Sequence, residues 1–285
     1  MIAAPAKINI GLRILRKRSD GYHDIETIFH RIALSDEITL ERSTGISFSS
    51  DDPTLPTDER NLCVRAAHLL RDEARGECGG VSIHLKKRIP AGAGLGGGSS
   101  DAASTLLGLE KLWKLRLTAQ RRHALAATVG SDVPYFLRPG SASATGRGEV
   151  LEYFRLDLPY WILLVYPAVQ VSTAWAYSQV RPGEGTNAVP LREILSGYAG
   201  NLGELSLNVK NDFEPAVFRS FPAVREIKER VISLGAGFAQ MSGSGSSVYG
   251  FFEEERRLRR AAEILGERFS VFVTPPFYAH SSVGA

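Results

Sequence analysis

The sequence predicts an α+β fold in two halves, and three observations support this prediction. Strand-like alternation and helix-like periodicity occur along the whole chain, without the strict strand–helix alternation of a parallel α/β sheet. The 285 residues are 44% hydrophobic and 23% charged, which is enough apolar material to bury a sizeable core. A division near residues 150–160 would give two parts of normal domain size. We therefore expect domains over residues 1–155 and 156–285.

The first half of the chain contains three predicted strands and three predicted helices. Apolar and polar residues alternate in segments that predict strands, and apolar residues recur every three to four positions in segments that predict helices. Polar turns at 19–21 and a proline-rich loop at 50–60 separate them. The strands are expected at 6–15, 25–42 and 81–86, and the helices at 61–75, 102–113 and 118–130.

The second half repeats this mixture. An apolar run at 160–166 predicts a strand, and glycines interrupt a strand pair expected at 240–252. A helix should begin at Pro222 and end at Gly235. A basic amphipathic helix follows at 257–269, and a last strand at 271–273. Residues 183–190 are expected to form a loop.

Charge and composition narrow the class of protein. The net charge of +3, with acidic and basic residues interspersed, gives no reason to expect a nucleic-acid or membrane-surface partner. Cys63 and Cys78 lack metal-site spacing and are expected to be free thiols. We find no signal peptide, and no apolar run is long enough to span a bilayer. These observations together predict a cytoplasmic protein.

The most informative segment is Ile-Pro-Ala-Gly-Ala-Gly-Leu-Gly-Gly-Gly-Ser-Ser-Asp, residues 89–101. It fits neither common nucleotide loop: it lacks the Gly-Lys-Ser/Thr ending of a P-loop and the acidic residue that follows a dinucleotide fingerprint. Glycine-rich backbone at a helix N-terminus can still bind phosphate through N–H groups. The alternative is a flexible turn. Asp101 would repel a phosphate unless it points away or faces a cation.

A second glycine–serine cluster, Met-Ser-Gly-Ser-Gly-Ser-Ser at 241–247, lies in the other half of the chain. Read alone, it could be only a flexible hairpin. Two such clusters, one in each half, could close over one polyphosphate. The basic run Lys86-Lys87-Arg88 could equally be a solvated strand end.

Three polar residues could carry chemistry. Lys7 and Asn9 share one face of the first predicted strand, because side chains alternate along a strand. Asp132 lies in a short turn after a predicted helix. A lysine and an aspartate together suit phosphoryl transfer to a hydroxyl group, since the aspartate can orient or deprotonate the hydroxyl and the lysine can stabilise charge. The alternatives are a solvated strand face and a helix N-cap.

The order of three segments resembles the GHMP superfamily of small-molecule kinases, named after galactokinase, homoserine kinase, mevalonate kinase and phosphomevalonate kinase. The segments are Pro5-Ala6-Lys7, the loop from Pro90 to Ser100, and Ser242 to Ser246, and together they span nearly the whole chain. The resemblance implies two α+β domains with a cleft for ATP and substrate between them. It places the glycine loop and the catalytic residues in the first domain.

Within the superfamily, Asp20-Gly21-Tyr22-His23 and Gly130-Ser131-Asp132-Val133-Pro134 resemble the branch that acts on a cytidine-diphosphate-linked alcohol. This implies transfer of the ATP γ-phosphoryl group to the 2-hydroxyl of 4-diphosphocytidyl-2-C-methyl-D-erythritol, in the non-mevalonate isoprenoid pathway. Mg²⁺ is expected to accompany ATP. A kinase for an alcohol without a nucleotide, such as mevalonate or homoserine, and a binding module without catalysis are the competing interpretations.

The resemblance also implies a role for individual residues. Asp132 would be the catalytic aspartate and Lys7 its partner. The substrate would contact Asn9, Tyr22, His23, Thr173 and Tyr177, with Trp175 as the rival of Tyr177 for stacking on cytosine. ATP would be held by residues of the glycine loop and one residue upstream of it: Pro90, Gly92, Gly94, Leu95, Gly96, Gly97, Gly98, Ser99, Ser100 and Asn61. Ser100 is also the candidate Mg²⁺ ligand.

Overall fold

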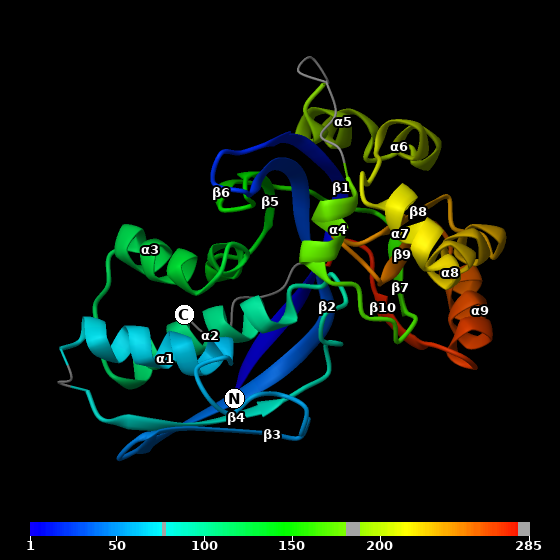
Figure 1. Ribbon diagram of the computed structural model, residues 1–285. Coiled ribbons are helices and arrows are strands. Elements are labelled where there is room, and N and C mark those ends of the chain that lie inside the picture. Colours follow the sequence, from blue (N-terminus) through cyan, green and yellow to red (C-terminus); the bar gives the residue numbers. More distant parts are fainter. Residues whose placement is uncertain (76–77, 181–188, 279–285) are drawn as a thin grey trace.

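The computed structural model describes residues 1–75, 78–180 and 189–278 (Figure 1). Within these ranges the chain forms two β-sheets with helices packed against them. The two sheets divide the sequence between Phe154 and Trp161. The mixed α+β architecture that the sequence predicts is therefore confirmed. The predicted loop at 183–190 lies, up to residue 188, outside the described residues.

The first sheet has six strands in the described part of the chain. Its order is β3-β4-β2-β5-β6, and β1 pairs with β2 as well. All pairs are antiparallel except β3 with β4. The strands are β1 (Ile2–Lys17), β2 (His23–Ser43), β3 (Ile46–Ser50), β4 (Gly80–Lys86), β5 (Ser141–Gly146) and β6 (Val150–Phe154).

Helices cover one face of this sheet: α1 (Leu62–Glu73), α2 (Gly97–Leu112) and α3 (Ala119–Val129) (Figure 1). The 3₁₀ helix η1 (Val133–Leu137) follows α3. Asn61 and Thr118 cap α1 and α3 by accepting a hydrogen bond from a first-turn N–H, as helix N-caps do. α2 begins five residues earlier than predicted, because Gly96 adopts a left-handed conformation and lets the glycine run enter the helix.

The second sheet has four strands among the described residues, in the order β10-β7-β9-β8. They are β7 (Trp161–Tyr166), β8 (Phe238–Met241), β9 (Val248–Phe252) and β10 (Ser270–Thr274). The helices of this half are α4 (Thr173–Gln179), α5 (Leu191–Tyr198), α6 (Leu202–Asn208), α7 (Glu214–Ser220), α8 (Pro222–Ser233) and α9 (Glu255–Gly266).

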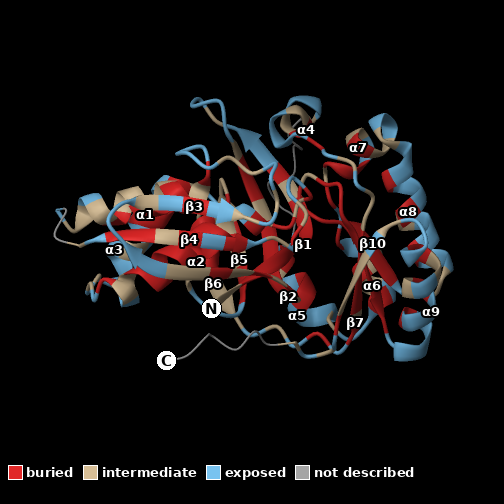
Figure 2. Cartoon of the chain, turned by 90° about the horizontal axis from the view of Figure 1, so that it is seen from below, coloured by how far each residue is buried: buried red, intermediate tan, exposed pale blue. Residues whose placement is uncertain are grey.

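β1 and β2 lie between two layers of core (Figure 2). Ala6, Ile8 and Ile10 of β1 pack against Tyr249 and Phe251 of the second sheet. Burying each of these isoleucines contributes about 1.5–3 kcal/mol to stability. Because side chains alternate along a strand, the same packing turns intervening residues of β1 to the opposite face. The core thus fixes which residues of β1 face the functional site.

The sequence prediction omitted β3, β5, β6 and the helices α4 to α7. The three strands are five or six residues long, and the four helices are at most eight residues long. Periodicity over so few residues is a weak signal. None of the helices in the described ranges is both long and apolar enough to cross a membrane.

Candidate active site

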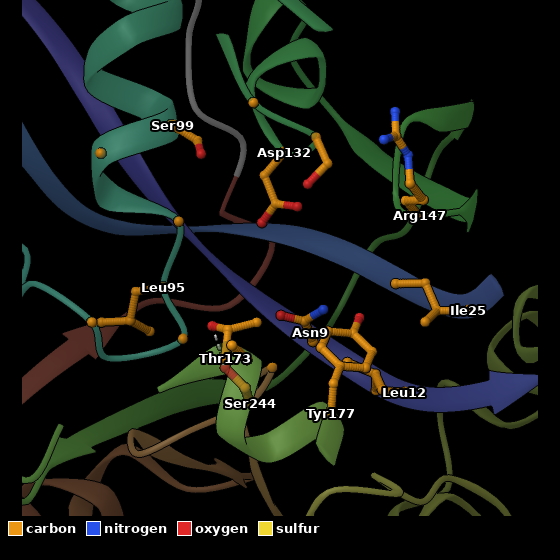
Figure 3. A pocket seen from close by; sticks show the side chains of 18 of the residues that line it. Asn9, Leu12, Ile25, Leu95, Ser99, Asp132, Arg147, Thr173, Tyr177 and Ser244 are labelled. Carbon is orange, nitrogen blue, oxygen red and sulfur yellow. Dashed lines mark hydrogen bonds between the residues drawn. The ribbon is translucent and has the colours of Figure 1, made fainter. Parts of the chain in front are cut away.

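A cavity of about 1160 Å³ opens between the glycine loop, β1, the turn before η1, and α4 (Figure 3). All of the predicted site residues line it except Asn61 and Ser100. Gly243 and Ser244 of the second glycine–serine cluster also reach it. Residues from both halves of the sequence therefore meet around one space, which is large enough for a nucleotide-sized ligand and a second small molecule.

Lys7, Asn9 and Asp132 come together at the centre of this cavity. The Lys7 Nζ lies 3.6 Å from Asp132 Oδ2 and donates a hydrogen bond to Asn9 Oδ1 at 2.5 Å. Burial lowers the pKa of the Lys7 ammonium, and the neighbouring Asp132 carboxylate opposes this shift. Lys7 is buried, whereas the Asp132 side chain is 30% exposed and can meet a ligand. The shared strand face of Lys7 and Asn9 is thus confirmed, and the alternative of a solvated face is wrong.

The glycine loop presents its backbone to the cavity. Gly92, Gly94 and Gly96 all have positive φ angles, which other residues rarely adopt. Gly97, Gly98 and Ser99, in the first turn of α2, line the cavity. First-turn N–H groups have no partner within the helix, and the helix dipole adds partial positive charge there. This arrangement can bind an anion such as phosphate.

The two glycine–serine clusters are in direct contact. The Ser242 hydroxyl accepts a hydrogen bond from Asn9 N at 3.1 Å and donates one to Gly94 O at 2.9 Å. A Cβ atom on Gly94 would lie only 2.1 Å from Ser242 O. Ser247 N also donates to Ala93 O. The second cluster therefore packs directly against the glycine loop, and the backbones approach so closely at residue 94 that only glycine fits there.

Both ends of the glycine loop are tied to a buried ion-paired cluster. Lys87 Nζ lies 2.5 Å from Asp36 Oδ2 and 2.8 Å from Asp101 Oδ2. Asp36 Oδ1 accepts hydrogen bonds from the backbone N–H groups of Arg88 and Ile89, just before the loop. The solvated-strand-end alternative is therefore wrong for Lys87. Asp101 faces a cation away from the cavity, so it does not repel a phosphate there.

Burial raises the pKa of the Asp101 carboxyl to about 8; Lys87 opposes this shift and Asp36 adds to it. At neutral pH the Asp101 carboxyl is therefore largely protonated, and Lys87 balances the charge of Asp36. A buried cluster with one positive and one negative charge avoids the cost of an uncompensated ion.

At the other end of the cavity, the His23 and Tyr177 rings stack with centroids 4.9 Å apart and planes at 15°. Burial, and then the charge of Lys17, lowers the pKa of His23, so its imidazole is neutral at pH 7. A neutral imidazole offers one donor and one acceptor. Burial, with a contribution from Asp132, raises the pKa of Tyr177 to about 12, which keeps its hydroxyl protonated.

Tyr177, not Trp175, lines the cavity. Trp175 packs edge-on against Phe221, with ring centres 5.3 Å apart, and both lie partly buried against the core of the C-terminal half. Thr173, one helical turn before Tyr177, lies at the cavity wall, where its hydroxyl is 3.1 Å from Ser244 Oγ (Figure 3). α4 therefore supplies both a polar and an aromatic contact.

Asn61 and Ser100 lie outside the cavity lining. The Asn61 side chain accepts a hydrogen bond from Cys63 N and donates one to Pro56 O, so its amide is used in capping α1. Ser100 is fully buried, and its hydroxyl has no hydrogen-bond partner among the described residues. The Ser99 hydroxyl, one residue earlier, lines the cavity instead (Figure 3).

Mg²⁺ is a hard cation that prefers oxygen ligands. No group of three or more His, Cys, Asp or Glu side chains could hold a metal in the described ranges. Asp132 and Ser99 nevertheless offer oxygen atoms at the cavity wall. This donor set suits an ion that keeps mostly water and phosphate ligands.

Sequence reasoning missed two cations of the cavity wall, Lys17 and Arg147. Arg147 lies in the turn between β5 and β6, with its guanidinium 5.0 Å from the centre of the exposed Tyr22 ring. Gly146 and Gly148, which flank it, both have positive φ angles. A single arginine between two glycines was the available signal, since glycine marks a tight turn that can carry a side chain into a site.

Comparison with known proteins agrees with this geometry. Residues 61–140 match the GHMP kinases N terminal domain, and residues 191–271 match the GHMP kinases C terminal domain. A 4-diphosphocytidyl-2-C-methyl-D-erythritol kinase of Chlorobium phaeobacteroides is 46% identical over 280 residues, covering 97% of each chain. The enzyme of the same name from Salinibacter ruber is 43% identical and covers 93% of this chain and 94% of its own.

Solved structures extend the comparison. A crystal structure of 4-(cytidine 5'-diphospho)-2C-methyl-D-erythritol kinase superposes with a TM-score of 0.82 at 39% identity, covering 95% of this chain and 97% of the other. Homoserine kinase from Cytophaga hutchinsonii has a TM-score of 0.68 at 18% identity, covers 95% of this chain and 94% of its own, and shares the fold. The chain therefore belongs to the GHMP kinase family, among the 4-diphosphocytidyl-2-C-methyl-D-erythritol kinases.

Proposed function

We propose that the protein transfers the γ-phosphoryl group of ATP to the 2-hydroxyl of 4-diphosphocytidyl-2-C-methyl-D-erythritol, giving the 2-phosphate and ADP. The observation that carries this proposal is one cavity in which a glycine loop, a Lys7–Asp132 pair and a His23–Tyr177 stack follow one another. The product would serve isoprenoid synthesis by the non-mevalonate route, and we expect the enzyme to act in the cytoplasm.

The glycine loop is the proposed phosphate site of ATP. Backbone N–H groups of Gly97, Gly98 and Ser99 would surround the phosphates, because the first turn of α2 leaves these donors without helical partners. Mg²⁺ would reduce the negative charge of the phosphates, with Asp132 and Ser99 as the nearest oxygen donors of the chain. Asn61 and Ser100 are not among the proposed ATP contacts, since both are buried outside the cavity.

Asp132 and Lys7 are the proposed catalytic pair. Asp132 would accept a hydrogen bond from the substrate hydroxyl and take its proton as the oxygen bonds to the γ-phosphorus and the bond to ADP breaks. Lys7 would contact Asp132 and stabilise the negative charge that develops on the transferred group. Asn9 accepts a hydrogen bond from Lys7 and donates one to Thr27 Oγ1, which fixes the direction of the ammonium.

The opposite end of the cavity is the proposed cytidyl site. The neutral His23 can present a donor and an acceptor to the polar edge of cytosine. Because the His23 and Tyr177 rings are in direct contact, we propose that the base takes the place of His23 against Tyr177. Tyr22 and Thr173 would border the nucleoside. Lys17 and Arg147 are suited to the diphosphate, since both are cations of the cavity wall.

The geometry argues against the two competing functions that the sequence left open. A kinase for mevalonate or homoserine would need no stacking residues beside its hydroxyl site, so His23 and Tyr177 argue against it. A nucleotide-binding module without catalysis would not need Asp132 and Lys7 to meet, and here they lie 3.6 Å apart. Both hypotheses retain the glycine loop as a phosphate site. The first differs from the proposal in the alcohol that is bound, and the second in the absence of phosphoryl transfer.

The test is release of ADP by the purified protein with Mg²⁺-ATP. The cytidyl diphosphate alcohol, mevalonate and homoserine should be compared at equal concentration. Turnover with the cytidyl compound alone would support the proposal. Turnover with another alcohol would retain the kinase and discard the cytosine site, and ATP binding without any turnover would favour the binding module.

A further inference from the structure

Arg31 is a buried cation that the proposed reaction does not use directly. It lies on β2, opposite Lys7 in the strand pairing, and is 7% exposed. Its Nη2 donates hydrogen bonds to Phe136 O at 2.9 Å and to Arg138 O at 2.5 Å. Its guanidinium also lies 5.7 Å and 5.9 Å from the ring centres of Tyr135 and Phe136. Arg31 therefore contacts the C-terminal end of η1 through four separate interactions.

η1 is the element that places Asp132. Asp132 is the N-cap of this 3₁₀ helix, and its carbonyl accepts a hydrogen bond from Tyr135 N at 3.2 Å. The Asp132 side chain has no capping hydrogen bond of its own, so apart from its ion pair with Lys7 its position depends on the backbone that follows it. Val133, Pro134, Tyr135 and Phe136 are buried, and η1 packs against α2 and α3.

The last carbonyls of a helix lack helical donors, and a cation near them interacts favourably with the helix dipole. Arginine is suited to this position because the two N–H groups of one terminal nitrogen, Nη2, reach two carbonyls while the guanidinium also lies near two aromatic rings. One side chain thus holds the far end of the short helix, while the near end carries Asp132 beside Lys7. A shift of η1 along its axis would change the distance between Asp132 and Lys7.

We propose that Arg31 is a positioning residue for Asp132, acting through η1. The proposal rests on the function given above, because Asp132 is there the group that receives the hydroxyl proton. Misplacing a reacting group by about 1 Å can lower a rate by about a hundredfold. Loss of Arg31 should therefore lower kcat by about ten- to a hundredfold and leave the KM for ATP nearly unchanged, since the glycine loop lies on another element.

A second cavity makes this proposal testable by chemical rescue. It has a volume of about 320 Å³, and Arg31 is part of its lining together with Gly140 and Ser141. Arg31→Ala would join the vacated space to this cavity, so a small guanidinium compound could enter and donate to the same carbonyls. Methylguanidinium should then restore part of kcat, at concentrations far below those that unfold proteins, and ethylammonium, which lacks the planar guanidinium that lies near the two rings, should restore less.

The experiment compares Arg31→Ala and Arg31→Lys with Arg155→Ala, a matched control. Arg155 lines the same cavity but is exposed and pairs with Asp157. We expect the control to have wild-type kcat, the lysine variant to be intermediate, and only the alanine variant to respond to methylguanidinium. A wild-type kcat for Arg31→Ala in an active preparation would overturn the proposal while leaving the proposed function intact. So would a loss of activity seen only as raised KM values.

Hydrogen exchange gives a readout that does not need turnover. Removal of Arg31 should speed exchange at the Val133 and Tyr135 amides, which donate within and just before η1, and should leave the α1 amides unchanged. Unchanged exchange at Val133 and Tyr135 would overturn the positioning role. If the wild-type protein phosphorylated none of the three alcohols, the proposed function would fail and this measurement would still decide whether Arg31 holds η1.

Discussion

The two ends of the cavity are built in different ways. The end with the glycine loop, where we propose that ATP binds, is called the nucleotide end. It consists of backbone supported by buried contacts: Lys87 pairs with both Asp36 and Asp101, and Ser242 donates a hydrogen bond to Gly94. The end with His23 and Tyr177, where we propose that the cytidyl substrate binds, is called the acceptor end. Its side chains are partly exposed, among them Tyr22 at 56% exposure. One end is shaped by the fold itself, and the other by residues projecting from it.

This difference predicts how the two ends respond to mutation. Substitutions at the nucleotide end remove buried contacts, so they should reduce stability and ATP binding together. Substitutions at the acceptor end leave the core untouched, so they should change substrate affinity alone. Asp132 lies between the two ends and depends on η1 for its position, which makes it the reference for a purely chemical defect.

The largest effect should come from Asp132→Asn. This change keeps the shape of the side chain but removes the proton acceptor, and general-base catalysis contributes about a hundred- to ten-thousandfold to a rate. We expect kcat to fall by that order with both KM values within a few-fold of wild type, measured by ADP release. Near-normal turnover would rule out the catalytic assignment. A large fall in the free energy of unfolding would show instead that Asp132 supports the fold, as the buried contacts of the nucleotide end do.

Lys87→Met should have the largest effect on stability. It leaves the Asp36 carboxylate without its counter-ion, and breaking a buried ion pair costs about 3–5 kcal/mol. Asp101→Asn is the matched control, because it keeps the Lys87–Asp36 pair. Urea unfolding would measure both. A loss for Lys87→Met no greater than for the control would contradict the idea that this cluster supports the loop.

Wild type and Asp101→Asn can also be compared across pH, because the direction of the change in stability is predicted. Burial raises the pKa of Asp101 to about 8 in the folded protein, so between its ordinary value of 3.8 and 8 the folded state binds more protons than the unfolded state. Stability therefore falls as pH rises through this window. Asp101→Asn lacks this titration, so wild type should lose stability relative to the variant between pH 5 and pH 8, roughly the window between those two pKa values.

Gly94→Ala should come next, compared with Gly92→Ala. Both glycines have positive φ, which costs an alanine about 1–2 kcal/mol. Only at Gly94 would the new Cβ collide with backbone, 2.1 Å from Ser242 O, whereas the nearest atom to a Cβ on Gly92 is 3.9 Å away. We expect this collision to weaken ATP binding by at least about 1.4 kcal/mol, which is a factor of ten in affinity. The KM for ATP should therefore rise at least about tenfold more for Gly94→Ala than for Gly92→Ala. Equal effects would show that the contact between the two glycine clusters is not needed.

His23→Ala should give the smallest effect, confined to the cytidyl substrate. Loss of one or two hydrogen bonds to a base costs about 1 kcal/mol each, so its KM should rise by about tenfold. The KM for ATP, kcat and the melting temperature should stay close to wild type. His84→Ala, at an exposed histidine of β4, is the control. A rise in the KM for ATP would place His23 at the wrong end of the cavity.

The same contrast explains what the sequence could predict. The glycine loop and the Lys7–Asn9 strand face were predictable because backbone conformation and strand alternation are local properties. The roles of Lys87 and Arg147 were not. Lys87 depends on Asp36, 51 positions away, and Arg147 reaches the cavity only after β5 and β6 have paired. The sequence also could not distinguish a ligand contact of Asn61 from a cap, because an asparagine before a helix looks the same in both cases; in the structure its side chain caps α1.

The alternation along β1 has a consequence for the fidelity of folding. Ile8 and Ile10 face the core between the sheets, while Lys7 and Asn9 face the cavity. A slip of β1 by one residue would exchange these sets, burying an ammonium in an apolar layer and exposing two isoleucines. Chains with that error should be too unstable to accumulate. The hydrophobic layer thus selects the register that forms the site, because any chain that buries Ile8 and Ile10 also directs Lys7 toward the cavity.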